Sequence, residues 1–482
     1  MVQIGELLKR MDNAVWGSGM LLFLLGTGCY LMVRLRFLPL RRLKFALFCV
    51  VGMEDKLLQK KPALSVERGR KQSKKTNGGV SSFSSLTTEL AATIGTGNIV
   101  GVATAMVLGG PGALLWMILS SVIGMATKLI ESMLAVKYRG RNDKNEMVGG
   151  PMYTLAKAFP LPGLGKALGK LFAACAVMAS FGMGNMTQSN SIAEAMKVSF
   201  DIPPATTGFI VTIVTILVVL GGIGSIAKVT RVVVPFMGIF YLMGAVLVIG
   251  THLENLPRGL YEIVVSAFSP QAVTGGVFGH MTVSAMEALR WGVSRGVFSN
   301  EAGLGAAGIS AAAADTTDYV KQGYISMTGV FLDTIVICSI TGLALACSGV
   351  VGTMDGNGEF LTGTELTIAA FQTTLGQNGA GFISICIALF AFATIVGWAY
   401  QGERAFEFLV RKSKYCIYYR FFYALIVFVG TICSLEAVWN FSDICNGLMA
   451  IPNLIGVLGL SGEACHEILE YDKSSVENKG GM

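Results

Sequence analysis

The sequence predicts an all-α protein that crosses a membrane many times. Of its 482 residues 53% are hydrophobic and only 14% are charged, whereas soluble domains carry about 25% charged residues. Apolar stretches of the roughly 20 residues needed to cross a bilayer recur along the chain, and the basic residues collect between them. Glycine and polar residues interrupt two of these stretches. We therefore predict about 11 transmembrane helices, two of them broken.

The apolar stretches follow one another at short intervals. Their predicted bounds are 15–36, 80–107, 111–136, 166–198, 206–223, 229–250, 276–312, 322–349, 379–410, 416–436 and 440–461. Three shorter pieces, amphipathic or partly apolar, are expected outside the spans at 41–51, 257–268 and 366–375. A polar segment at 55–78 and a polar, flexible tail from Gly462 complete the chain.

Basic residues set the orientation, because Lys and Arg are enriched in cytoplasmic loops. The segment after the first span is densely basic, and alternation places the basic clusters at 137–144, 228–231 and 404–414 on the same side. The loop at 349–378 lacks Lys and Arg and falls on the opposite side. We therefore predict a multi-pass protein of the plasma membrane, with its N-terminus outside and its C-terminus in the cytoplasm.

The spans divide into two groups of five once the first is set aside. The second and seventh spans open these groups, enter the membrane from opposite sides and carry interruptions at 95–101 and 292–303. Paired interruptions of this kind indicate an inverted repeat with its substrate site at the breaks. The predicted organisation is an extra N-terminal helix (1–40), a basic cytoplasmic loop (41–79), a first repeat (80–250), an extracellular connection with an amphipathic helix (251–275), a second repeat (276–461) and a cytoplasmic tail (462–482).

The interruption in the second span has the chemistry of a combined anion and cation site. Unpaired N–H groups at the start of a half-helix attract an anion, and the carbonyls that end the other half suit a hard cation. Backbone N–H groups at Thr96 and Gly97 would hold a carboxylate, with the Asn98 amide beside them. Carbonyls of Ala91 and Ile94 would face a cation. The alternative is that the glycines only pack against a neighbouring helix.

Polar residues on two other spans could complete such a site. Gln188 lies in a polar run of the fourth span and can both donate and accept hydrogen bonds. Thr394, in the ninth span, could add a hydroxyl to a sodium shell, and Trp398, one turn further on, could wall off a small substrate. For Trp398, ordinary helix packing is the alternative.

The seventh span carries charges that are costly near hydrocarbon. Arg290 and Arg295 are either functional or paired structurally with Glu287, Glu301 or backbone carbonyls. Ser299 and Asn300 are the better candidates for lining a cavity, by the chemistry of their uncharged side chains. Histidines and cysteines are scattered rather than clustered.

Motifs of other function classes are missing from the sequence. It contains no GxxxxGK[ST] or HExxH pattern. The GxGxxG match at 303–308 has no strand before it, which argues against a dinucleotide site. The net charge of +7 lies mostly between the apolar runs, so no nucleic-acid partner is indicated. We predict a protein that is not an enzyme, with no cofactor and with the lipid bilayer as its surroundings. Its oligomeric state is left open.

Four blocks of the sequence resemble the alanine or glycine:cation symporter family, the sodium:alanine symporters. They are 93–101 (TIGTGNIVG), 109–117 (GGPGALLWM), 149–153 (GGPMY) and 299–305 (SNEAGLG). The resemblance covers nearly the whole chain. It departs at Leu115, where an aromatic residue is usual, and at Ile118, where tryptophan is common. Both positions bear on packing of the third span rather than on the site.

The resemblance implies the leucine-transporter fold, a ten-helix inverted repeat, with one added N-terminal helix. It also implies sodium-coupled uptake of alanine or glycine by alternating access. The implied substrate contacts are Thr96, Gly97, Asn98, Gln188, Gly292, Val293 and Trp398, and the implied sodium ligands are Ala91, Ile94 and Thr394. Glutamine or serine is the alternative substrate, since some such proteins take glutamine. A channel or sensor on the same scaffold and a membrane enzyme are the other hypotheses.

Overall fold

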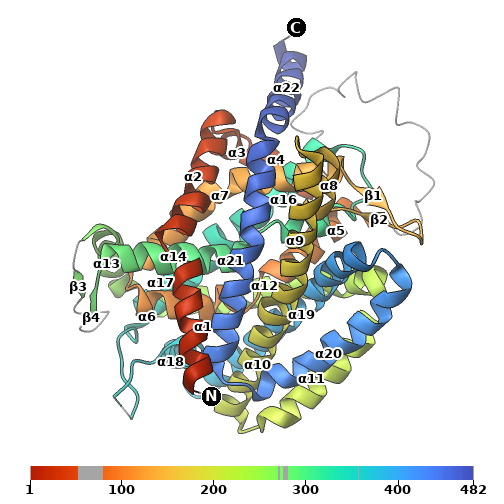
Figure 1. Cartoon of the computed structure of the whole chain (residues 1–482). Coiled ribbons are helices and arrows are strands. Elements are labelled where there is room, and N and C mark those ends of the chain that lie inside the picture. The colour runs from red at the N-terminus through yellow and green to blue at the C-terminus, as the bar shows by residue number, and fades with distance from the viewer. Residues whose placement is uncertain (1, 53–79, 270–271, 275–280, 357, 481–482) are drawn as a thin grey trace.

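A computed structural model describes residues 2–52, 80–269, 272–274, 281–356 and 358–480 of the chain. Helices dominate these residues, and the two short antiparallel hairpins among them lie in connections (Figure 1). Most of the predicted basic loop, 53–79, lies outside the described residues.

The N-terminal region is longer and more helical than its apolar stretch suggests. Helix α1 spans Val2–Val15 and α2 spans Ser18–Arg34, so α2 corresponds to the predicted first span and α1 is an additional helix before it. The two helices part at Gly17, the residue before α2, which has extended backbone. Two short helices follow, α3 at Leu38–Arg41 and α4 at Leu43–Val50.

The next five spans contain the first interruption. Helix α5 and helix α6 share one predicted span, and a π-helical turn at Gly182–Met186 joins α9 to α10. Strand β1 (Gly140–Arg141) pairs with β2 (Met147–Val148), with Gly140 opposite Val148. The helices are α5 (Ser82–Thr93), α6 (Val100–Leu108), α7 (Gly112–Lys137), α8 (Pro151–Ala158), α9 (Pro162–Phe181), α10 (Thr187–Phe200), α11 (Pro204–Val219) and α12 (Gly222–Thr251).

The connection to the second group contains α13 (Leu256–Phe268), as predicted, and an unpredicted hairpin of β3 (Ala272–Thr274) and β4 (Met281–Val283). A second π-helical segment, Phe331–Cys338, joins α16 to α17. The remaining helices are α14 (Ala285–Asn300), α15 (Ala306–Ala311), α16 (Tyr319–Val330), α17 (Ser339–Ser348), α18 (Gly363–Leu375), α19 (Asn378–Val410), α20 (Cys416–Ile432), α21 (Leu435–Gly459) and α22 (Ser461–Gly480).

Eight helical stretches within the described residues are long and apolar enough to cross a membrane. The other three predicted spans correspond to α11, which has only 16 residues, and to the two broken helices, α5 with α6 and α14 with α15. Each break divides its span into two helices, and neither helix alone is long enough to cross a membrane. The fold class is that of a polytopic membrane protein, and the count of eleven spans stays a prediction.

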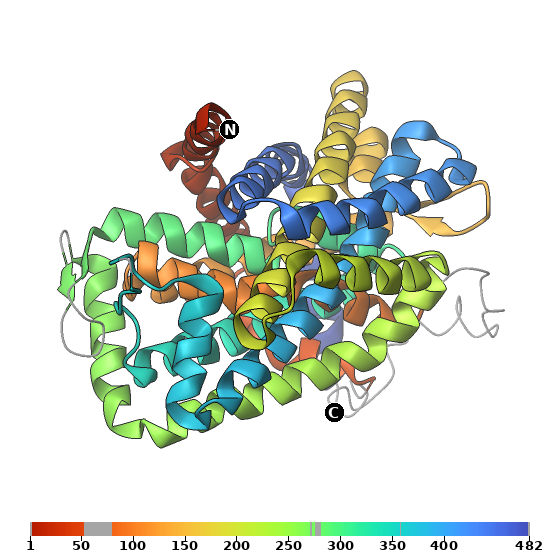
Figure 2. The same ribbon diagram turned by 90° about the horizontal axis from the view of Figure 1, so that it is seen from below.

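Helix α7 runs through the middle of the bundle, where it packs against both α14 and α16. Its second half, from Met125 to Val136, is buried without interruption. Helix α12, by contrast, runs along the outside of the bundle (Figure 2) and exposes Val232, Phe236 and Met243. An apolar outer face of this kind suits contact with lipid chains.

The C-terminal segment is helical, so the expectation of a flexible tail is wrong over the described residues. Helix α22 begins two residues after α21 ends, and its first turns are tied to the end of α7. Lys137 forms ion pairs with Glu463 and Glu467, and Tyr138 donates a 2.6 Å hydrogen bond to Glu463. These contacts fix the direction in which α22 leaves the bundle.

Candidate functional site

The first break lies where the sequence predicted it. Helix α5 ends at Thr93, Gly95 has extended backbone, a single 3-10 turn covers Thr96–Asn98, and α6 begins at Val100. The Gly95 N–H donates to the Asn98 Oδ1 at 2.8 Å. Because this hydrogen bond pairs a backbone N–H that the helix leaves free, the break is a defined structure rather than a frayed helix end.

Thr394 of α19 reaches the end of α5 from across the bundle. Its hydroxyl lies 3.0 Å from the Ala91 carbonyl oxygen and 3.4 Å from that of Ile94. A Cβ atom on Gly95 would lie 2.3 Å from the Thr394 Oγ1, so only glycine allows this approach. The three predicted cation ligands are therefore adjacent, each offering an oxygen.

Gln188 contacts the same break close to Thr394, since a Cβ atom on Gly95 would lie 3.1 Å from its Oε1. Its Oε1 accepts a 3.1 Å hydrogen bond from the Thr96 N–H, and its Nε2 donates to the Met183 carbonyl at 2.9 Å. The π-helical turn just before α10 places Gln188 there, because a wide turn shifts the register of the residues that follow. The Gln188 side chain therefore accepts the hydrogen bond of the Thr96 N–H, the group that the sequence analysis assigned to a substrate carboxylate.

Trp398 lies one turn beyond Thr394 and is fully buried. Its ring packs directly on the backbone of Gly184, where a Cβ atom would lie 2.3 Å from the ring. Its indole N–H interacts with the buried Glu301 carboxylate, although the two groups do not form a hydrogen bond of standard geometry in the described residues.

The second break is shorter than predicted and lies further along the chain. Helix α14 continues to Asn300, and the backbone turns at Glu301, Gly303 and Gly305, whose φ angles are 58°, 88° and 80°. The prediction of a break from Gly292 is therefore wrong. Two glycines at positive φ, a conformation glycine adopts without penalty, end the helix.

Gly292 and Val293 thus belong to a continuous helix. A Cβ atom on Gly292 would lie 2.4 Å from the Ala113 carbonyl oxygen of α7, so this glycine serves close helix packing. Val293 lines a small hollow between α2, α7, α14 and α21. Neither position gives geometric support to the substrate contact that the resemblance implied.

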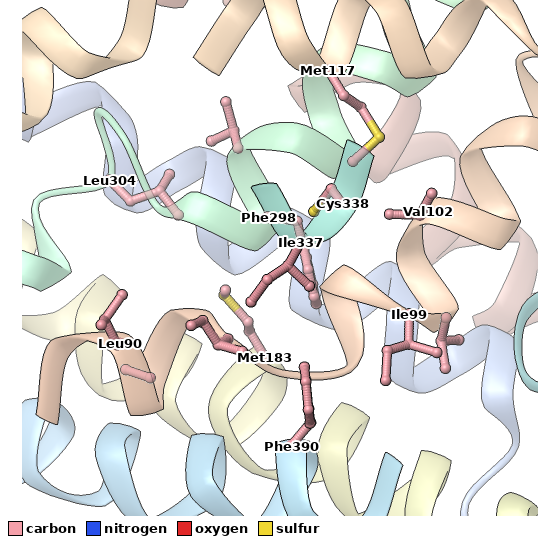
Figure 3. Close-up of a cluster of buried hydrophobic side chains, with 14 of the residues drawn as sticks. Leu90, Ile99, Val102, Met117, Met183, Phe298, Leu304, Ile337, Cys338 and Phe390 are labelled. Atoms are coloured by element: carbon pink, nitrogen blue, oxygen red, sulfur yellow. The ribbon is translucent and has the colours of Figure 1, made fainter. Parts of the chain in front are cut away.

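The two breaks meet through the last turn of α14 instead. A Cβ atom on Gly97 would lie 3.2 Å from both the Phe298 Cδ1 and the Ser299 Cα. Figure 3 shows Phe298 and Ile337 on one side of the first break and Phe390 on the other. Apolar side chains thus enclose the short non-helical segment.

The sequence analysis missed Asp333 and Cys338, both in the π-helical segment between α16 and α17. The Asn98 Nδ2 donates to the Asp333 Oδ1 at 2.7 Å and lies 3.3 Å from the Cys338 Sγ. The Ser299 hydroxyl donates to the other Asp333 oxygen at 2.8 Å. One aspartate therefore joins residues of both breaks. Its position within an apolar stretch was a visible signal, since ionisable residues inside a membrane are usually functional.

Lys128 of α7 also joins the two broken helices. Its Nζ lies 3.4 Å from the Glu89 Oε1 of α5 and donates to the Asn300 carbonyl at 3.0 Å. Both side chains are completely buried. A cation beside the last carbonyl of α14 stabilises the negative end of that helix, so Lys128 helps to hold the second break in place.

The arginines of α14 pair with partners that the sequence analysis did not consider. Arg295 makes two hydrogen bonds to the Asp443 carboxylate of α21, at 3.0 and 2.6 Å, in a buried position. Its guanidinium lies 4.7 Å from the Trp439 ring centroid, and Trp439 stacks on Phe298. The expected partners, Glu287 and Glu301, are not used; Glu287 caps α14 through Ser284.

The site therefore offers two kinds of binding chemistry side by side. Backbone N–H groups and amide side chains can hold a carboxylate, and carbonyl and hydroxyl oxygens can hold a hard cation. In the described part of the chain, no three His, Cys, Asp or Glu side chains form a metal cluster. Paired broken helices with such a site, in a polytopic membrane protein, define a secondary transporter.

The family follows from comparison with known proteins. Residues 1–481 match the sodium:alanine symporter family, and the chain belongs to that family. It is 45% identical to the sodium/alanine symporter AgcS of Methanococcus maripaludis over 97% of each chain. It is 34% identical to the probable sodium/glutamine symporter GlnT of Bacillus subtilis, over 97% of this chain and 91% of that one.

The fold resembles a solved transporter structure. The crystal structure of MhsT in complex with L-phenylalanine superposes with a TM-score of 0.55 at 13% identity, covering 83% of this chain and 99% of that one. The leucine-transporter fold is therefore the fold of this chain, and its function class is transport rather than catalysis.

Proposed function

We propose that this protein carries out sodium-coupled uptake of a small neutral amino acid, alanine or glycine, across the plasma membrane. The observation that carries the proposal is the convergence of Thr394, Ala91 and Ile94 oxygens beside the N–H groups of the first break. A cation and a carboxylate bound side by side stabilise each other, which couples their binding reciprocally.

Sodium would bind at the end of α5. In the structure the Thr394 hydroxyl donates hydrogen bonds to the carbonyl oxygens of Ala91 and Ile94. Rotation of that hydroxyl would turn its lone pairs toward an ion, because a hydroxyl can donate or accept. The three oxygens would then belong to one oxygen shell, which is the ligand type that hard cations prefer.

The substrate carboxylate would bind at Thr96, Gly97 and Asn98. In the structure the Gln188 Oε1 and the Asn98 Oδ1 accept from backbone N–H groups of the break. These two amide oxygens occupy positions that a carboxylate would take. Substrate binding would replace them and free both amides to contact the rest of the amino acid.

The close packing of aromatic side chains around the site supports a small substrate. Trp398 packs against Gly184, Phe298 packs against Gly97, and both aromatic side chains are almost completely buried. A methyl or hydrogen side chain fits beside them more readily than a long one. Glutamine or serine is the alternative substrate, and the sodium/glutamine name of the Bacillus subtilis relative favours testing glutamine directly.

Alternating access requires a barrier on each side of the site. Arg295, Asp443, Trp439 and Phe298 form a buried layer next to the first break. This layer would close the outer route. The β1–β2 hairpin, which carries Arg141 and Lys144, and helix α22 lie toward the end opposite the N-terminus (Figure 1), which supports a cytoplasmic C-terminus and an external N-terminus.

The test is a counterflow experiment with the purified full chain in liposomes. Alanine, glycine, serine and glutamine are each supplied with sodium or with choline. We expect saturable, sodium-dependent exchange of alanine and glycine, and Asn98→Ala should lose most of it while remaining folded. Exchange of glutamine alone would show that glutamine, and not alanine or glycine, is the substrate. Non-saturable flux, or flux unchanged in choline, would refute coupled symport and favour a channel.

A further inference from the structure

A cavity lies away from the breaks, at the end of the bundle that carries the β1–β2 hairpin. It has a volume of about 640 Å³ and opens between that hairpin, α8, α9 and the end of α19. Four basic residues line it: Arg141, Lys166, Lys170 and Arg411. Nothing in the transport mechanism proposed above uses it.

The basic residues of this cavity keep their charge available. Across the described ranges, none of the four has a carboxylate within 4 Å. Arg141 donates only to the backbone and side-chain oxygens of Asn145, both at 3.0 Å. Lys166 and Lys170 lie four residues apart on α9 and therefore project from the same face of that helix.

The two acidic residues in the cavity wall are already occupied. Glu407 pairs with Arg404 at 2.8 Å and accepts from the Asn142 amide at 2.9 Å. Asp143 accepts hydrogen bonds from both the backbone N–H and the hydroxyl of Ser413. The cavity therefore presents a net positive field, and a ligand with a phosphate group would neutralise it.

An apolar surface lies on another face of the same helix. Leu164, Leu171 and Met178 follow the helical spacing along the outer face of α9, and each has about half of its side chain exposed. Leu409, in the cavity wall, is also exposed. On a membrane protein, an apolar outer stripe contacts acyl chains. A basic cavity and such a stripe on one helix suit one molecule with a charged head and an apolar tail.

We propose that this cavity binds the headgroup of an anionic phospholipid, with the acyl chains along α9. The phosphate would lie among Lys166, Lys170, Arg141 and Arg411, as basic pockets at a membrane surface bind anionic lipid. The binding also concerns transport, because Glu407, Asn142 and Ser413 fix the hairpin to the end of α19. That helix carries Thr394 and Trp398, so an occupied cavity stabilises the hairpin-docked conformation.

The proposal is tested by native mass spectrometry of the full chain with phosphatidylglycerol or phosphatidylcholine of identical acyl chains. Wild type should retain phosphatidylglycerol preferentially. Lys166→Gln with Lys170→Gln should bind it about 25-fold more weakly, at about fivefold for each basic residue. Lys166→Arg with Lys170→Arg keeps both charges and should bind phosphatidylglycerol as wild type does. This variant therefore separates the loss of charge from an effect of substitution on folding.

The matched control removes two positive charges elsewhere at the same end of the molecule. Lys228→Gln with Arg231→Gln, on the exposed start of α12, should leave phosphatidylglycerol binding unchanged. An equal loss in this control would overturn the proposal in favour of general attraction to anionic surfaces. Glycerol phosphate, which has no chains, should compete only weakly; competition equal to that of the lipid would identify a soluble-anion site instead. Alanine counterflow is not the readout, so failure here leaves the proposed transport function standing.

Discussion

Replacing Thr394 with valine removes one hydroxyl and nearly preserves the shape of the side chain. In the structure that hydroxyl lies 3.0 Å from the Ala91 carbonyl oxygen, and only 1% of Thr394 is exposed. We expect Thr394→Val to raise the sodium concentration for half-maximal alanine uptake, because the ion loses one oxygen ligand.

The magnitude follows from the value of a hydrogen-bond partner to a charged group, about 1.5–3 kcal/mol. Since about 1.4 kcal/mol corresponds to a tenfold change in an equilibrium constant, the half-maximal sodium concentration should rise about tenfold to 100-fold. The rate at saturating sodium should change much less. Uptake of labelled alanine into liposomes over a sodium titration measures both quantities.

Two controls make the result specific. Thr394→Ser keeps the hydroxyl and should keep the sodium dependence near that of wild type. Thr367→Val removes another fully buried hydroxyl, which bonds only within α18 to the Gly363 carbonyl at 2.9 Å, and should leave it unchanged. An unaltered sodium titration in Thr394→Val, or an equal shift in Thr367→Val, would refute the assignment of Thr394 to the ion.

Three further predictions concern packing, an ion pair and pH. Gly184→Ala forces a methyl into the ring of Trp398, so alanine uptake should fall at least tenfold while the protein stays folded by size-exclusion chromatography; wild-type uptake would argue against close packing there. Arg295→Leu leaves the buried Asp443 charge uncompensated, at a cost of about 3–5 kcal/mol, and should lower the melting temperature; adding Asp443→Leu should recover most of the loss, and no recovery would contradict a charge effect. Hydrogen bonds from the end of α7 lower the pKa of Glu463, so its contribution is present above the ordinary carboxyl pKa and lost as pH falls through the lowered one. A spin-label distance between α7 and α22 should lengthen in that acid range, and it should show no such transition in Glu463→Gln.

The first break was predictable, to within two residues at each limit, because its cause is local. Gly95, Gly97 and Asn98 are poor helix formers wherever they occur, so their cluster marks the break without knowledge of the rest of the fold. Thr394 and Gln188 were candidates for that site by the chemistry of their polar side chains, and the resemblance to a family implied their contacts with sodium and substrate. The structure brings these side chains together, and their roles in binding stay predictions.

The second break shows why glycine alone is ambiguous in a membrane helix. Gly292 and Gly296 lie within α14 and allow α7 to approach closely, whereas Gly303 and Gly305 have positive φ angles and end the helix. The same residue type thus serves packing or breaking, depending on a neighbour that sequence does not reveal. The predicted limits of the break followed the glycines and therefore began too early.

Long-range pairings were not predictable for a related reason. Arg295 meets Asp443 across 148 residues, and no local pattern relates the two. Sequence analysis considered Glu287 and Glu301 because they are near in the chain. Asp333 was overlooked among apolar neighbours, although it links Asn98 and Ser299.

The thiol of Cys338 lies beside both breaks, 3.3 Å from the Asn98 amide and 3.4 Å from the Ser299 hydroxyl. It is completely enclosed in this conformation. A water-soluble thiol reagent can therefore modify it only after the protein opens a wet route to the middle of the membrane. With the other cysteines replaced, the rate at which the reagent labels Cys338 from each side of the bilayer would measure how often the protein opens to that side. Cys338 is therefore a native labelling site for following the transport cycle.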